Sequence, residues 1–363
     1  MRTKRETLLT TEAKERIYQG VAITRLPWLL NRTVFRKAHT VITYHGVRDR
    51  PLPIDDECFI SRDRFISQLL YAKRHFNVVP LSEAVERTQA RADSGGRPLL
   101  SITFDDGFQN VHDITFPILK RLGLPATVFL VTGLIDTDRT IWYCALNHAL
   151  ERTRMQSFTW RGHRYDLAGP GSRSLASRGL QERLKKLPQK DLVRETRAIL
   201  SALGFEEHVK VPEDSPFRIL SSKAIRDMHS SGLIEFGAHT HTHSILSLLP
   251  EAEQEREILS SINRVSECTG RPCTLFSYPN GEEGDFSPVT RMLLARHRVR
   301  CSVTMMRGPN YPGSDPYSYR RYGIENGMGM HRFVMNVHHM VWVKRSLARA
   351  GRSMAGKVGL DAC

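Results

Sequence analysis

The sequence predicts an α/β protein with a parallel sheet or barrel. Short β-rich runs alternate with segments of helical periodicity along most of the 363 residues, and this alternation is typical of parallel βαβ units. Polar clusters directly follow several of the predicted strands, and α/β sheets and barrels carry their chemistry at the carboxyl ends of their strands. The chain is long enough to bury a large core, as one big domain or two ordinary ones.

The individual elements can be placed from residue 39 onward. Apolar and β-rich runs predict strands at 39–44, 77–79, 98–104, 126–131, 234–237, 274–278 and 300–304. Helical spacing predicts helices at 61–75, from 82 onward, and at 116–122, 221–230, 251–268, 288–297 and 331–349. Ser61 is expected to cap the first helix, and Gly123 to end the third.

Three stretches differ from this pattern and suggest the domain organisation. Residues 1–38 are polar, basic and weakly patterned, and we take them as an N-terminal leader. Residues from about 153 to 215 are rich in arginine, serine and glycine, with one clear helical pattern near 191–203. They predict an insertion or cap on a catalytic domain that spans 39–335, and residues 336–363 predict a basic helix or tail.

The chain is strongly basic. Its 53 Lys and Arg residues exceed its 38 Asp and Glu residues by 15, and such a surplus attracts nucleic acid, anionic lipid or phosphorylated substrates. Because no nucleic-acid-binding motif is present, we expect no nucleic-acid partner. A peripheral contact with an anionic membrane surface remains open beside a basic surface that is merely solvated.

The sequence favours a cytoplasmic protein, with the inner membrane surface as an alternative location. No run approaches the roughly 18 apolar residues that span a bilayer. The most apolar N-terminal stretch, 21–30, is interrupted by Arg25 and Pro27 and lies too far into the chain for a signal peptide. The six cysteines are dispersed, so we expect reduced thiols.

Two adjacent carboxylates, Asp105 and Asp106, follow the predicted strand at 98–104 and precede Gly107. Neighbouring carboxylates repel each other and are costly in a dry site without a cation or a shared proton. A metal ion that takes one carboxylate as a ligand and leaves the other as a base would resolve this conflict.

Three histidines, His239, His241 and His243, follow the predicted strand at 234–237. In an extended chain all three would point to one face and could form a three-histidine site. In a helical turn, His239 and His243 would share a face and His241 would point elsewhere. Imidazole and carboxylate ligands with open positions are typical of a hydrolytic divalent metal site.

With these residues the chain resembles the polysaccharide deacetylases of carbohydrate esterase family four, also called the NodB-homology domain, over roughly 39–335. Thr103-Phe-Asp-Asp-Gly107 is similar to the family's first motif, in which the first Asp is the general base and the second binds metal. His239-Thr240-x-x-His243 is similar to the second motif, whose two histidines complete an Asp-His-His site. Tyr44-His45-Gly-Val and Leu124-Pro-Ala-Thr-Val-Phe129 are similar to segments of exopolysaccharide-cluster members. The resemblance implies a distorted (β/α) barrel and leaves His241 outside the metal site.

The sequence departs from the family pattern at the residues around the base. The family's third motif commonly carries an arginine that pairs with the base, whereas Ser277 stands at the equivalent position here. Arg321 is our candidate to replace that arginine. No clear counterpart exists for the family's late general-acid histidine, and His331 and His45 are both candidates. The resemblance also assigns the backbone N–H of Asn280 to stabilising the oxyanion.

These observations predict a hydrolase that removes N-acetyl groups from a sugar in a polysaccharide or oligosaccharide. The resemblance implies a divalent metal, with zinc as the expected ion, held by Asp106, His239 and His243, with Asp105 as base. One alternative is a deformylase or deacetylase of a lipid-phosphate-linked sugar at the membrane surface. A second alternative is a catalytically silent carbohydrate-binding homologue, although an intact Asp105 argues against it.

Overall fold

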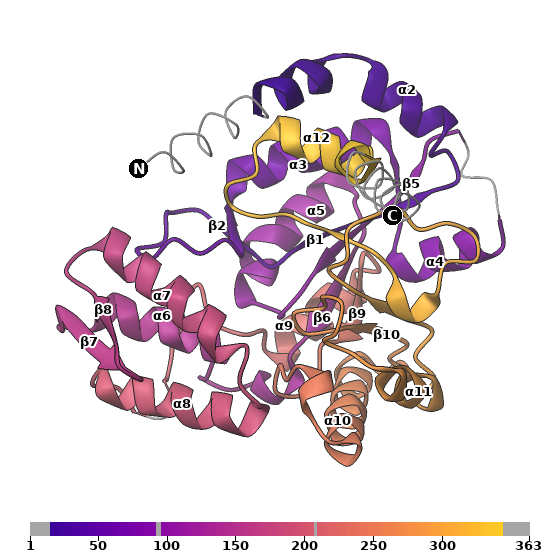
Figure 1. Ribbon diagram of the computed structural model, residues 1–363. Helices are drawn as coiled ribbons and strands as arrows, with labels where there is room; N and C mark the ends of the chain where they lie inside the picture. Colours follow the sequence, from indigo (N-terminus) through magenta and orange to yellow (C-terminus); the bar gives the residue numbers. More distant parts are fainter. Residues whose placement is uncertain (1–14, 92–95, 207–208, 344–363) are drawn as a thin grey trace, which may run out of the picture.

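The computed structural model describes residues 15–91, 96–206 and 209–343, and it shows a curled parallel sheet surrounded by helices (Figure 1). The order of the main sheet is β11-β10-β9-β6-β5-β1-β12, with β4 paired to β5. Every strand pair of this sheet is parallel. The strands are β1 (His39–Tyr44), β4 (Asn77–Val78), β5 (Leu99–Phe104), β6 (Ala126–Leu130), β9 (Ile234–Ala238), β10 (Leu275–Ser277), β11 (Cys301–Val303) and β12 (Tyr322–Gly323).

Helices connect these strands and supply the outer layer. The helices beside the main sheet are α2 (Leu26–Thr33), α3 (Arg62–His75), α4 (Leu81–Gln89), α5 (Phe116–Leu122), α9 (Ser222–Ser230), α10 (Glu251–Thr269), α11 (Pro288–Arg296) and α12 (Met330–Val337). A short parallel pair, β2 (Gly46–Arg48) and β3 (Phe59–Ser61), lies between β1 and α3. This right-handed alternation of strand and helix is the arrangement expected of a parallel sheet.

The segment from Tyr319 to Gly323 joins the two edges of the curled sheet. Tyr319 forms a parallel bridge with Val303 of β11, and Tyr322 pairs with Ile42 of β1. One short extended segment therefore contacts both edge strands and closes the barrel. Arg321 lies within this closing segment.

The strand residues pack in two directions, as a curled sheet with a filled interior requires. Ile42 and Tyr44 belong to the large apolar cluster beneath the outer helices. Val41, which precedes Ile42 in β1, instead packs with Phe129 and Tyr319. Both faces of the sheet are therefore buried, and all six residues of β5 are inaccessible to solvent.

A second lobe with its own apolar core follows β6. It contains α6 (Trp142–Arg152), the antiparallel hairpin β7 (Ser157–Trp160) and β8 (His163–Asp166), α7 (Pro170–Leu184) and α8 (Gln189–Ala202). Leu146, Leu180 and Ile199 pack together in this core, separately from the barrel core. Figure 1 shows this lobe beside the barrel.

The predicted alternation of elements is confirmed, with most boundaries within one or two residues. Gly123 ends α5 in the left-handed conformation, at φ 64°. Ser61 precedes α3 but makes no side-chain capping hydrogen bond. Sequence analysis missed β7, β8 and α7. Their apolar residues pack inside the second lobe but form no regular pattern along the chain.

Helical structure also extends into the region taken as a leader, at 15–23 and in α2. The predicted helix at 331–349 is interrupted in the described part, since α12 ends at Val337 and helical structure resumes at 340–343 after a turn. Residues 344–363, which hold most of the predicted basic tail, lie outside the described residues. Among the described helices, none has the length and apolar character needed to cross a membrane.

Candidate active site

Parallel strands deliver the candidate residues to one end of the barrel. Asp105 and Asp106 follow β5, His239 follows β9, and Ser277 is the last residue of β10. Since the strands are parallel, their carboxyl ends meet at one edge, where α/β proteins place their chemistry.

The Asp105-Asp106-Gly107 turn directs the two carboxylates to different partners. Asp106 and Gly107 have φ values of 73° and 72°, both in the left-handed region. A Cβ atom at position 107 would lie 2.7 Å from Leu130 Cδ2, so this tight turn requires glycine. Asp105 faces the barrel interior, whereas Asp106 faces the histidines.

Asp106, His239 and His243 form a group that can hold a metal ion. Asp106 Oδ1 lies 3.6 Å from His239 Nε2 and 3.3 Å from His243 Nε2. Ligand atoms about 2.1 Å from a tetrahedral zinc ion would lie roughly 3.4 Å apart, so the spacing fits. Asp106 Oδ1 is buried and has no hydrogen-bond partner among the described residues, a costly state for a carboxylate oxygen without a cation.

The neighbours of this group fix the direction of its donor atoms. The Nδ1–H of His239 donates to the Ser277 carbonyl at 2.7 Å, which leaves the Nε2 lone pair facing Asp106. Burial lowers the pKa of His239 to about 4, which favours the neutral imidazole that a metal needs. The Tyr143 hydroxyl donates a short hydrogen bond to Asp106 Oδ2. Of the two carboxylate oxygens of Asp106, only Oδ1 therefore faces His239 and His243 without another partner.

The loop after β9 adopts neither of the two geometries considered from the sequence. Thr240 and His243 have φ values of 60° and 63°, so the segment is a tight irregular turn. This turn brings His239 and His243 together, while His241 Nδ1 lies 3.1 Å from the Thr132 hydroxyl. Glu257 of α10 accepts the backbone N–H of His241 at 2.8 Å and so fixes the turn.

Arg321 forms a bidentate ion pair with Asp105 inside the barrel. Its Nη1 donates to Asp105 Oδ1 at 2.8 Å and its Nη2 to Oδ2 at 2.7 Å. The guanidinium is fully buried. Its other hydrogen bonds go to oxygens of the barrel wall, namely the carbonyl of Thr304 and the hydroxyls of Thr43, Thr103 and Ser277.

The arginine determines the charge state of Asp105. Burial alone would raise the pKa of Asp105, but the Arg321 guanidinium more than offsets this effect and holds the pKa below its ordinary value. Ser277 Oγ lies 3.3 Å from Asp105 Oδ2 and 2.9 Å from Arg321 Nη2. The small side chain of Ser277 thus leaves room for Arg321, which comes from the segment that closes the barrel.

His45 lies level with Asp105 on the neighbouring strand. Tyr44 is paired with Phe104 in the register of β1 and β5, so His45 and Asp105 are the next residues on each strand. A charge on His45 lowers the pKa of both Asp105 and Asp106. Its Nδ1 is buried and has no hydrogen-bond partner among the described residues.

The other two candidates occupy different surroundings. Asn280 follows β10 with φ 61°, and its side-chain amide donates to Asp285 at 2.6 Å. His331 lies on α12, where it forms a short hydrogen bond with Glu15. Within the described part of the chain it makes no contact with Asp105 or Asp106, so the structure does not bring it into the group.

Sequence reasoning missed Tyr143, which α6 of the second lobe contributes. No motif marks this tyrosine, because its partner Asp106 is distant in sequence and the contact exists only after the lobe packs on the barrel. The same packing buries the Tyr143 hydroxyl and, together with the nearby Asp106 charge, raises its pKa well above the ordinary value. Tyr143 therefore acts as a hydrogen-bond donor to Asp106 at neutral pH.

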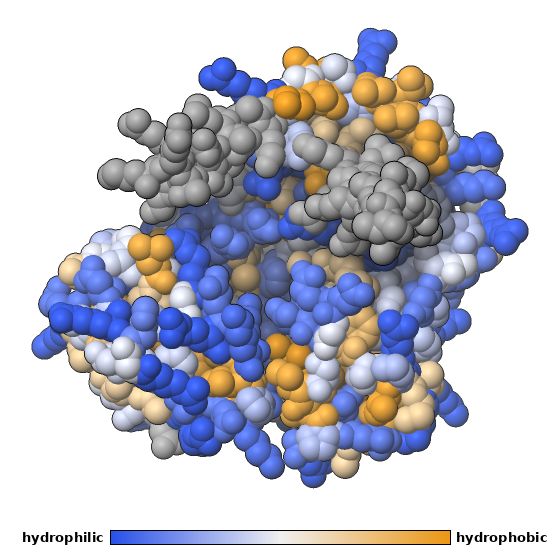
Figure 2. All heavy atoms as spheres, in the orientation of Figure 1, coloured by the Kyte–Doolittle hydropathy of each residue, from blue (hydrophilic) through white to orange (hydrophobic). Residues whose placement is uncertain are grey.

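Two cavities lie between the second lobe and the barrel, and neither is lined by Asp105, Asp106, His239 or His243. One of about 390 Å³ is lined by segments 47–53, 109–114 and 213–217 and by residues of α6. Another of about 280 Å³ lies beside His241, between the barrel and α8. Figure 2 shows the surface hollowed between the second lobe and the barrel. Such volumes are suited to small ligands or sugar units.

Comparison with known proteins assigns the family. Residues 92–300, more than half of the chain, match the sequence profile of the polysaccharide deacetylases. The chain therefore belongs to the polysaccharide deacetylase family. No curated protein sequence matches it.

Solved structures show the same fold. The deacetylase PplD of Streptococcus pyogenes, solved with acetate, is 15% identical with a TM-score of 0.55, over 83% of this chain and 98% of its own. IcaB from Ammonifex degensii is 20% identical with a TM-score of 0.55, over 83% and 97%. A polysaccharide deacetylase from Bacillus cereus is 16% identical with a TM-score of 0.53, over 83% and 69%. The expected NodB-type barrel is thus confirmed.

The Asp105–Arg321 pair generates a prediction about stability. Arg321→Met leaves a carboxylate buried without its partner, and loss of one member of a buried ion pair costs about 3–5 kcal/mol of unfolding free energy. Urea denaturation measures this cost. The double variant Asp105→Asn/Arg321→Met should lose less than the sum of the two single variants. Arg320→Met, at an exposed neighbour, is the control; an equal loss in that control would contradict the prediction.

Proposed function

We propose that this protein is a metal-dependent deacetylase that hydrolyses the N-acetyl group of a sugar in a polysaccharide or oligosaccharide. Membership of the polysaccharide deacetylase family supports the reaction class. The single observation that carries the proposal is the placement of an arginine-held carboxylate, Asp105, beside the Asp106–His239–His243 group. This arrangement provides a charged base next to a set of metal-binding atoms.

The residues around the group divide the chemical work. A zinc ion bound by Asp106, His239 and His243 would polarise the acetamide carbonyl and acidify a water molecule. Asp105, ionised and oriented by Arg321, accepts the proton of that water. The Asn280 N–H, which has no acceptor among the described residues, is proposed to donate to the developing oxyanion.

We assign the general acid to His45 in preference to His331. His45 stands beside Asp105 at the end of the adjoining strand, whereas His331 pairs with Glu15 on α12. Expulsion of an amine requires a proton, and a histidine at a strand end next to the base is placed to deliver it. Asp56, Asp105 and Asp106 all lie close enough to His45 for a charge on it to lower their pKa values.

The base assignment is tested by acetate release from a panel of soluble N-acetylated oligosaccharides. Asp105→Asn should lower turnover on the order of 10²–10⁴-fold, because general-base catalysis contributes about that much, while zinc content stays unchanged. Asp227→Asn, an exposed carboxylate that pairs with His112, is the control and should keep full activity. Full activity in Asp105→Asn would disprove the assignment, and acetate release by no variant would favour a silent binding homologue.

The metal-site assignment is tested by zinc titration of the metal-free protein in a calorimeter. His243→Ala removes a proposed ligand and should weaken zinc binding more than about 100-fold. This loss exceeds the one expected when a residue that only hydrogen-bonds to a metal ligand is removed. His241→Ala should bind zinc as the wild type does, because its side chain contacts Thr132. If His241→Ala lost zinc and His243→Ala kept it, the site would have to involve a different turn.

The acid assignment is tested by varying the leaving group. His45→Ala should slow hydrolysis of the N-acetyl amide on the order of 10²–10⁴-fold. An aryl acetate needs no proton to expel its phenolate, so its hydrolysis should fall far less. The matched control is His331→Gln, which should leave both substrates unaffected. Equal losses on the two substrates, or a selective loss in His331→Gln, would count against His45.

A further inference from the structure

The N-terminal helical region carries a concentration of exposed apolar side chains. Of the thirteen large hydrophobic residues exposed in the described chain, six lie between residues 17 and 34. They are Ile17, Ile23, Leu26, Trp28, Leu29 and Val34. Figure 2 shows hydrophobic side chains gathered over α2 and the helical segment before it. Solvated helices of soluble proteins do not usually concentrate such residues outward.

The exposure in α2 follows the helical period. Pro27 and Asn31 face inward and are buried. Leu26 and Leu29 lie on the opposite side and are 48% and 50% exposed. At 3.6 residues per turn, Arg32 falls beside the Leu26–Leu29 stripe on the outward face, and its guanidinium stacks 4.9 Å above the Trp28 ring. The outward face of α2 therefore combines an apolar stripe with cations, as helices that lie in a membrane interface do.

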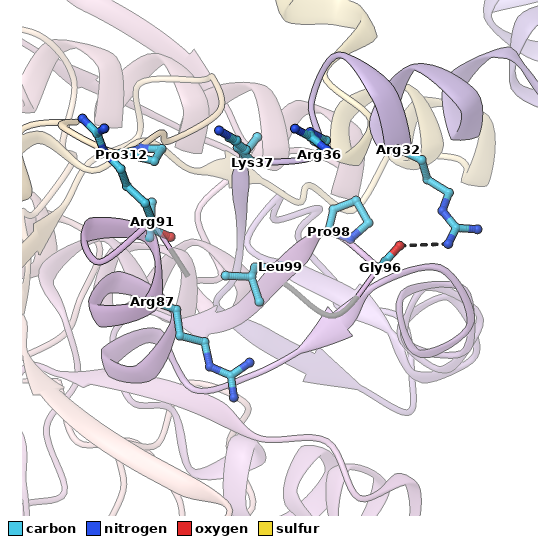
Figure 3. A pocket seen from close by; sticks show the side chains of 11 residues that line it. Arg32, Arg36, Lys37, Arg87, Arg91, Gly96, Pro98, Leu99 and Pro312 are labelled. Atoms are coloured by element: carbon cyan, nitrogen blue, oxygen red, sulfur yellow. Dashed lines mark hydrogen bonds between the residues drawn. The ribbon is translucent and has the colours of Figure 1, made fainter. Parts of the chain in front are cut away.

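A basic cavity adjoins this helix (Figure 3). Its volume is about 440 Å³, and none of the described residues that line it is acidic. The cations on its wall lie in or just after α2 and α4, and they are Arg32, Arg36, Lys37, Arg87 and Arg91. An opening whose charged lining residues are all cations attracts phosphate-bearing anions.

Most of this positive charge is not neutralised by the part of the chain that the structure describes. Arg87 pairs with Glu83 at 2.5 Å, and Arg32 donates to the Gly96 carbonyl at 2.8 Å. Arg36, Lys37 and Arg91 make no side-chain hydrogen bond or ion pair with any described residue. Three cations are therefore available to an external anion.

We propose that Leu26, Trp28 and Leu29, together with the cationic cavity, form a docking surface for a bilayer that contains anionic phospholipids. The apolar stripe would enter the headgroup boundary, where tryptophan is favoured. The cations would contact lipid phosphates near the surface. A soluble anion would leave the apolar stripe exposed, and a second copy would bring two like-charged cavities together. A bilayer with anionic phospholipids would cover the apolar stripe and also supply phosphates to the cationic cavity.

Docking in this way would point the proposed active site away from the bilayer. The cavity wall includes Ala38 and Leu99, at the amino ends of β1 and β5. Asp105 lies at the carboxyl end of β5, and six residues of strand span about 20 Å. The catalytic end would thus face the aqueous side, where it would meet a long sugar chain more readily than a sugar attached to a lipid headgroup.

Flotation with lipid vesicles tests the proposal independently of deacetylase activity. The full-length wild type should float with vesicles of 70% phosphatidylcholine and 30% phosphatidylglycerol, and should not float with pure phosphatidylcholine. Arg36→Gln/Lys37→Gln/Arg91→Gln should reduce partitioning roughly 100-fold, from three lost charges. Leu26→Gln/Leu29→Gln should reduce it at least about tenfold.

Matched controls separate this surface from general charge or hydrophobicity. Lys185→Gln/Lys186→Gln/Lys190→Gln removes the same charge from the second lobe, and Leu175→Gln/Met292→Gln removes exposed apolar groups elsewhere. Both controls should bind as the wild type does. The basic residues after 344 are present in every variant, so differences report on the docking surface. Unchanged thermal melting shows that each variant is folded.

The position of Trp28 provides a second readout. Vesicles with brominated acyl chains should quench part of the wild-type tryptophan fluorescence, and Trp28→Phe should lose that quenching. The proposal is overturned if the wild type does not bind anionic vesicles, or if the α2 and cavity variants bind as tightly as the controls. It is also overturned if Leu26→Gln/Leu29→Gln dissociates a dimer without changing vesicle binding.

Discussion

The buried ion pair between Asp105 and Arg321 is the constraint on which the site depends. A carboxylate in the centre of a closed barrel is costly unless a cation meets it with good geometry. Arg321 supplies that cation from the segment that joins β11 to β1, so the contacts that close the barrel also hold Asp105, the proposed base, in its charged form. The hydroxyls of Thr43 and Thr103 bind the same guanidinium and tie it to both central strands.

This pair explains how two adjacent acids can share a turn without sharing a proton. Asp105 is neutralised from inside the barrel, whereas Asp106 turns outward to His239 and His243. The left-handed backbone at Asp106 makes the divergence possible, because it reverses the chain within one residue. Each carboxylate therefore has its own partners, and of the two only Asp106 keeps an Oδ1 without a hydrogen-bond partner.

Much of the fold could be predicted from the sequence, because the strands are short apolar runs and the helices are periodic. The motif residues Asp105, Asp106, His239 and His243 could be singled out for the same local reason: they directly follow strands. Arg321 could also be expected as the partner of Asp105, from the resemblance to the family, but the local pattern could not show how the chain brings it there. Arg321 approaches Asp105 only because Tyr319 and Tyr322 pair with opposite edges of the sheet. The placement of His45 likewise depends on the register of β1 against β5.

The second lobe illustrates the same limit and adds a functional consequence. Its apolar residues pack on one another, so its sequence shows little of the regular pattern that predicts helices and strands. Yet α6 brings Tyr143 to Asp106, and residues of the lobe line the cavities beside the group. The lobe therefore shapes the end of the barrel where the chemistry is proposed, while α2 and the cationic cavity occupy the opposite end. A protein built in this way separates the surface that would locate it from the surface that would select its sugar, so either can change without disturbing the ion pair between them.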